Sequence, residues 1–109
     1  MSNIDLSALV TAADKALNHD MAQIARVKTV CRRRIFAVID EIAQINLAAA
    51  VAADQLPEDR LETYRLGLDW IKAMRDACQP LVADPSQDPE RDDCWPPVPA
   101  GVAEMAAQY

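Results

Sequence analysis

Glycine, proline and aromatic residues are scarce in this 109-residue chain. Its only two glycines are Gly67 and Gly101, none of its seven prolines occurs before Pro57, and aromatic residues make up 5% of the sequence. Glycine and proline are the residues that most often interrupt helices, so their absence from the first half predicts long helical structure there. The length of the chain, about that of one domain, also excludes a multidomain enzyme.

The sequence also lacks cysteine motifs and membrane-spanning runs. Cys31, Cys78 and Cys94 show neither CxxC nor Cys/His spacing, which argues against a disulfide framework or a structural zinc site. The chain starts Met-Ser-Asn-Ile-Asp without a basic leader, and no apolar run approaches the roughly 20 residues that span a bilayer. We therefore expect no membrane association, no metal or other cofactor, and a reducing cytoplasmic location.

Charge is distributed unevenly. Seventeen acidic against eleven basic residues give a formal net charge of −6, and residues 83–109 contain only Arg91 as a basic residue against six acids. A negative net charge is unfavourable for a protein that binds nucleic acid in general. The excess of negative charge is concentrated at the C-terminal end.

Apolar residues recur with alternating spacings of three and four from Val10 to Leu56. This spacing is typical of a helix that packs along another helix. It predicts a helix from near Asp5 to near Ala53, with Lys28 as an interruption, and leaves open whether Asn18-His19-Asp20 is a break or a polar face. The predicted helix-association seam consists of Leu17, Met21, Ile24, Ile35, Val38, Ile42, Ile45 and Ala49.

Leu56-Pro57-Glu58-Asp59 predicts a new helix start, because proline suits the first helical turn and acids favour the positive helix N-terminus. The second helix should run from about Pro57 to Leu81 and pack antiparallel on the first. The expected fold is all-α, a helical hairpin or coiled-coil-like bundle over residues 1–82 followed by an extended, Pro-rich acidic tail over 83–109. Residues 101–109 could form one further helical piece.

A hairpin of this length buries little surface, so self-association is expected. The seam favours a coiled coil of three or more helices over one of two, because it has Ile35 and Ile42 at one heptad position and Val38 and Ile45 at the other.

The tail carries acids at alternate positions from Asp84 to Asp92 and then Cys94-Trp95-Pro96-Pro97. The alternation resembles a calcium loop, but Pro89 and Trp95 stand where glycine and glutamate are needed, which favours a solvated acidic linker. Trp95 is either an anchor that folds the tail back or a peptide-like ligand for a partner groove. Tyr64 and Trp70 on the second helix are core or partner-binding residues.

Arg32, Arg33 and Arg34 form the most basic run and are candidate polyanion contacts. They would flank the seam, where basic residues usually form solvated ion pairs, and no aromatic residues are interleaved with them. A solvated or partner-facing surface is therefore favoured over nucleic acid, and the acidic tail could screen the arginines. No acid, base and nucleophile can be grouped, since His19 stands alone beside Asp20, so no catalytic residue is predicted.

Three patches resemble small proteins of phage and prophage tail modules. They are Arg33-Arg34-Ile35 with 44–49, Tyr64-Arg65 with Trp70-Ile71 and Met74-Arg75, and Asp93-Cys94-Trp95-Pro96-Pro97-Val98-Pro99. The resemblance implies a non-enzymatic structural or chaperone-like component of a phage-like tail, located in the host cytoplasm or in a tail particle, that associates with itself or with another tail protein. The alternative is a small helical adaptor that binds nucleic acid or an acidic partner through Arg32–Arg34.

Overall fold

The computed structural model describes the backbone of residues 2–109 and the side chains of residues 19–109. The described chain is all-α and contains no strand. Its elements are α1 (Ser2–Val38), α2 (Glu41–Ala52), α3 (Glu58–Ala83), a single 3-10 turn η1 (Asp92–Cys94) and α4 (Val102–Ala106).

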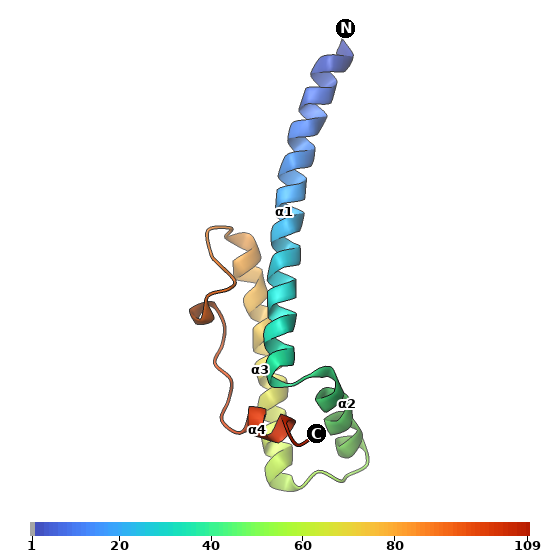
Figure 1. The fold of residues 1–109 in the computed structure, drawn as a ribbon, viewed down its shortest axis with the longest axis vertical. Helices are drawn as coiled ribbons and strands as arrows, with labels where there is room; N and C mark the ends of the chain where they lie inside the picture. The colour runs from blue at the N-terminus through green and yellow to red at the C-terminus, as the bar shows by residue number, and fades with distance from the viewer. Residues whose placement is uncertain (1) are drawn as a thin grey trace.

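The helices α1 and α3 lie side by side and run in opposite directions (Figure 1). The short α2 connects them at one end and lies beside the pair. After α3 the chain reverses and descends along the helices to α4, which packs near the start of α3 (Figure 1). We call residues 84–101 the return segment. The molecule is elongated, with extents of 73 × 28 × 17 Å, and the N-terminal part of α1 continues well beyond the end of α3.

The first helix departs from the prediction in where it is interrupted. The backbone is helical through Asn18, so the break considered there is absent, whereas a break occurs at Ile39 and Asp40 inside the expected single helix. Asp40 has extended backbone angles, and its side chain accepts a 2.7 Å hydrogen bond from the Ala43 amide, which caps α2. The prediction of one helix to Ala53 is therefore wrong.

The core lies between α1 and α3 and extends to α2 and α4. The break at Asp40 turns α2 so that Ala43 and Leu47 face inward. The buried residues of the core include Val27, Val30 and Ile35 of α1, Ile39 of the break, Leu47 of α2, Trp70, Ile71, Met74 and Leu81 of α3, Trp95 of the return segment, and Val102 and Met105 of α4.

Gly67 lies where α3 meets both Ile39 of the break and Val102 of α4. A Cβ atom at this position would lie 3.3 Å from Ile39 Cδ1, closer than side chains normally pack, and 3.4 Å from Val102 Cγ1, at ordinary contact distance. Gly101 starts α4 with φ of +87°, a left-handed conformation that glycine adopts without a steric cost. Gly67 thus accommodates Ile39, and Gly101 accommodates the turn into α4.

No single helix among the described residues is long and apolar enough to cross a bilayer. The segments His19–Val38 and Glu41–Ala52 meet that criterion of length and composition only when taken together, and the chain bends by 61° between them.

Replacing Asp40 tests the cap that creates the break. Asp40→Ala should lower the free energy of unfolding by roughly 1 kcal/mol, because the Ala43 amide loses its acceptor. Asp40→Asn keeps a side-chain oxygen and should change stability by less than half as much. Urea denaturation followed by circular dichroism measures both, and equal stability of Asp40→Ala and wild type would show that Asp40 does not stabilise the break.

Candidate functional site

The pair formed by α1 and α3 has two sides, and the return segment covers one of them. Trp95 is only 7% exposed, and its indole Nε1 donates a 2.7 Å hydrogen bond to the Pro89 carbonyl. Trp70 on α3 donates from its own Nε1 to the Pro96 carbonyl at 3.1 Å. Of the two possibilities for Trp95, the structure therefore shows the anchor that folds the tail back.

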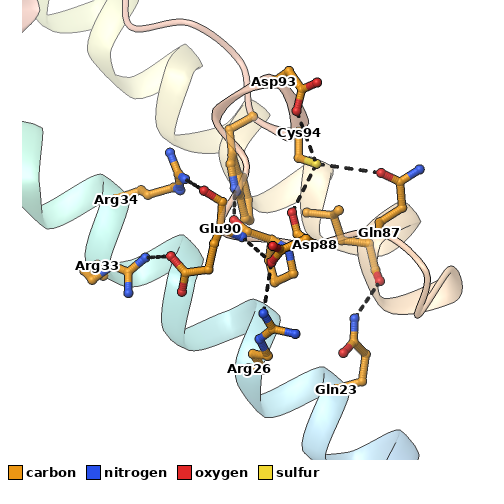
Figure 2. Close-up of polar contacts among 12 residues, drawn as sticks. Gln23, Arg26, Arg33, Arg34, Gln87, Asp88, Glu90, Asp93 and Cys94 are labelled. Atoms are coloured by element: carbon orange, nitrogen blue, oxygen red, sulfur yellow. Dashed lines mark hydrogen bonds and ion pairs between the residues drawn. The ribbon is translucent and has the colours of Figure 1, made fainter.

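The acids of the return segment meet the arginines of α1 (Figure 2). Arg26 pairs with Asp88 at 2.9 Å, Arg33 pairs with Glu90, and Arg34 pairs with Asp92 at 2.9 Å. Arg34 also donates to the Glu90 carbonyl, and its guanidinium lies 5.9 Å from the centre of the Trp95 ring. Arg33 and Arg34, two of the three candidate polyanion contacts, are thus engaged within the chain.

The alternating acids have a structural explanation. Residues 88–91 form a turn in which the Arg91 amide donates to the Asp88 carbonyl, and Asp92 then begins η1. In this conformation Asp88, Glu90 and Asp92 each reach an arginine of α1. Asp84 instead accepts hydrogen bonds from the amide and hydroxyl of Ser86 and closes the turn after α3. Among the residues with described side chains, no group of His, Cys, Asp or Glu is arranged to hold a metal ion.

The hydrogen bond from Arg33 holds the pKa of Glu90 below its ordinary value of 4.5, and the positive charges of Arg33 and Arg34 act in the same direction. A carboxylate whose pKa is lower in the folded state stabilises that state above the unfolded pKa and loses this effect as the pH falls. The ion pair of Glu90 with Arg33 therefore stabilises the attachment of the return segment less at acidic pH.

The other side of the α1 and α3 pair is open. A groove of about 390 Å³ runs between the two helices there and reaches Gln44 of α2. We call it the open groove; its lining residues are Lys28, Cys31, Arg32, Ile35, Phe36, Gln44, Arg75 and Cys78. Two further hollows adjoin it, one lined by Ile24 and Val82 and the other by Leu47 and Leu68.

The open groove combines an apolar floor with basic edges. Ile35 and Cys31 are buried at its base, and the Phe36 ring is 39% exposed. Lys28, Arg32 and Arg75 line it, and none of the three forms an ion pair with any residue whose side chain is described. Arg32, the third candidate polyanion contact, thus lies on the opposite side from Arg33 and Arg34. Lys28, which interrupts the predicted seam, belongs to this groove.

Two thiols lie together in the open groove. The Sγ atoms of Cys31 and Cys78 are each 3.6 Å from the Met74 carbonyl oxygen. Burial and a hydrogen bond with Cys78 raise the pKa of Cys31 to about 12, although Arg75 acts in the opposite direction. At neutral pH the Cys31 thiol is therefore protonated and a poor nucleophile.

The predicted seam is divided by the break at Asp40. Ile35 is buried, and Val38 and Ile24 are partly buried, whereas Met21, Ile42, Ile45 and Ala49 are exposed. Leu17 lies outside the residues whose side chains are described. Within one chain the predicted seam is not a continuous buried stripe, because α2 turns Ala43 and Leu47 inward and its Ile42 and Ile45 outward. Burial of these residues against another chain stays a prediction.

The aromatic partner-binding candidates are mostly covered by the chain itself. Trp70 is buried beneath the return segment, and Trp95, which belongs to that segment, is itself buried. Tyr64 is partly buried beside the hollow between α2 and α3. The residues that sequence reasoning missed are Val27 and Val30, which belong to the core shared with α3, and Arg75, which lines the open groove with Lys28 and Arg32.

No protein-family model, no curated protein sequence and no solved structure matches this chain.

Acidification should weaken the attachment of the return segment. As the pH falls below 4.5, the ordinary pKa of a glutamate, protonation of Glu90 removes its ion pair with Arg33, and Trp95 is exposed to water more often. The tryptophan fluorescence maximum should then move to longer wavelength. Glu90→Gln should show part of this shift already at pH 7, whereas Glu62→Gln, at an exposed position on α3, should behave as wild type. A wild-type spectrum unchanged between pH 7 and 3.5 would contradict this account.

Proposed function

We propose that this chain is a non-enzymatic assembly protein that acts through helix–helix association, as a structural or chaperone-like component of a phage-like tail. The observation that supports association best is the outward face of α2. The link to a phage-like tail is supported by the three sequence patches described above.

The helix α2 is apolar on nearly its whole circumference. Only Glu41, Gln44 and Asn46 of its twelve residues are polar. Helices of this kind are normally buried on all sides. Within one chain, however, α2 buries only Ala43 and Leu47, and it leaves Ile42 67% exposed and Ile45 61% exposed. Burying an isoleucine completely contributes roughly 1.5–3 kcal/mol, so covering both is a substantial driving force.

A second copy of the chain is the occupant we assign to this face. Ile42, Ile45 and Ala49 are spaced by three and four residues and form one apolar stripe, with Ala52 continuing it. Such a stripe can pack against its own copy across a two-fold axis, and the alanines permit close approach of the helices. The expectation of three or more strands depended on a seam shared by Ile35 and Ile42, and the break at Asp40 separates these residues.

The chemistry of the remaining polar groups supports a non-enzymatic role. The acids of the return segment are engaged with arginines, and the Cys31 thiol is held in its protonated form. These groups stabilise the fold and are not free to act on a substrate.

Replacing the two exposed isoleucines tests the proposal. The double variant Ile42→Ser with Ile45→Ser should weaken self-association at least about tenfold, because it removes most of the apolar area of the stripe. Sedimentation equilibrium over a range of concentrations measures this.

Leu66→Ser is the matched control, since Leu66 is also exposed, at 44%, but lies on α3. It should associate as wild type does. A wild-type chain that is monomeric at every concentration, or a control variant that dissociates as much as the double variant, would refute self-association through α2.

A further inference from the structure

We infer that the open groove binds an amphipathic helix of a partner protein, one with acidic side chains on either side of its apolar stripe. This site is separate from the outward face of α2, and the inference does not depend on self-association. It assigns a surface and a partner chemistry that the proposed function leaves open.

The shape of the open groove suits a helix. Two antiparallel helices form its walls, and a third helix laid along such a pair completes a three-helix arrangement with apolar side chains at the centre. Together, the open groove and the adjoining hollow at Ile24 follow α1 from Ile24 to Phe36, about 18 Å at the helical rise of 1.5 Å per residue. This length accommodates about three turns of a partner helix. Its apolar side chains would cover the exposed Phe36 ring, Ile35 and the two thiols.

The charges of the open groove specify acidic residues on the partner. On the covered side of the pair, Arg26, Arg33 and Arg34 are each neutralised by one acid of the return segment. On the open side, Lys28, Arg32 and Arg75 are left without ion pairs among the described side chains. In a chain of net charge −6, three such cations around an apolar floor are complementary to an acidic apolar surface.

The return segment shows how this helix pair accepts such a ligand. It places Trp95 and Pro89 against the helices and Asp88, Glu90 and Asp92 against the arginines. Apolar contacts at the centre are thus flanked by acid–arginine pairs on one side of the pair. The partner helix would reproduce this combination on the other side.

An acidic amphipathic helix fits the open groove better than nucleic acid does. Nucleic acid would be repelled by the net charge, and the floor offers one exposed ring, Phe36, in place of a series of stacking aromatics. Aliphatic side chains flanked by carboxylates match both the floor and the edges.

The test uses the full chain and two designed helical peptides of 14 residues. Both have a leucine stripe, flanked by glutamates in one peptide and by lysines in the other. Fluorescence anisotropy should show that the glutamate peptide binds at least about tenfold more tightly than the lysine peptide, and that added salt weakens its binding. Equal binding of both peptides would overturn the inference.

Charge reversal in the protein locates the binding site. The double variant Arg32→Glu with Arg75→Glu should lose at least about tenfold in affinity for the glutamate peptide and gain affinity for the lysine peptide. Because the gain requires a folded groove, it separates lost charge complementarity from unfolding. Arg65→Glu, an exposed site on α3 outside the open groove, should bind the glutamate peptide as wild type does; a loss equal to that of the double variant would overturn the assignment.

Two further experiments test whether the peptide binds at α2 instead and whether the groove binds nucleic acid instead. The double serine variant at Ile42 and Ile45 should still bind the glutamate peptide, whatever its oligomeric state. Loss of binding in that variant would show that the peptide occupies α2 or that the groove forms only between copies, and either result overturns the inference. Displacement of the peptide by a single-stranded oligonucleotide at equal concentration would favour a nucleic-acid site instead.

Discussion

The packing of α1 against α3 is the contact on which the rest of the structure depends. Val27, Val30 and Ile35 meet Ile71, Met74 and Leu81 in a buried layer that joins segments far apart in the sequence. When two helices pack together, apolar surface is left on both sides of the pair, and a further segment is needed to cover each side. The chain covers one side with its own return segment, and that leaves the open groove and the outward face of α2 uncovered within one chain. These are the two surfaces at which we propose that other molecules bind.

Charge and apolar contact act together on the covered side. Ion pairs between exposed side chains contribute little individually, so Arg26, Arg33 and Arg34 do not by themselves fix the return segment. The buried Trp95, with its hydrogen bond to Pro89, supplies the apolar contact, and the acids select the position along α1. The combination explains why a proline-rich acidic sequence is ordered against the helices.

The sequence predicts the helical class and the start of α3 well, because the absence of glycine and proline and the motif at Pro57 are local signals. It does not predict the break at Asp40, because the heptad spacing continues across it. The only local signal is the capping residue Asp40 followed by Glu41, and its use depends on Ile39 and Leu47 finding buried positions against α3 and α4. Because the heptad spacing continues across the break, the predicted seam also included Ile42 and Ile45.

The sequence shows which charged residues are present at the site, but it does not show which of them come together. The arginine run and the alternating acids are visible in the sequence, but their pairing requires the chain to reverse after Ala83. Arg32 is left without an acid of the tail because the tail packs on the side of α1 that carries Arg33 and Arg34. Arg75 joins Lys28 only because α1 and α3 are antiparallel, which brings distant positions together.

The account rests on the claim that α2 is incompletely covered in one chain and is covered by another. Amide hydrogen exchange of the intact protein, measured over a hundredfold range of concentration, tests this most directly. We predict that protection of the amides in 41–52 rises with concentration while that of the return segment stays constant. Protection of 41–52 that is the same at every concentration would contradict the account.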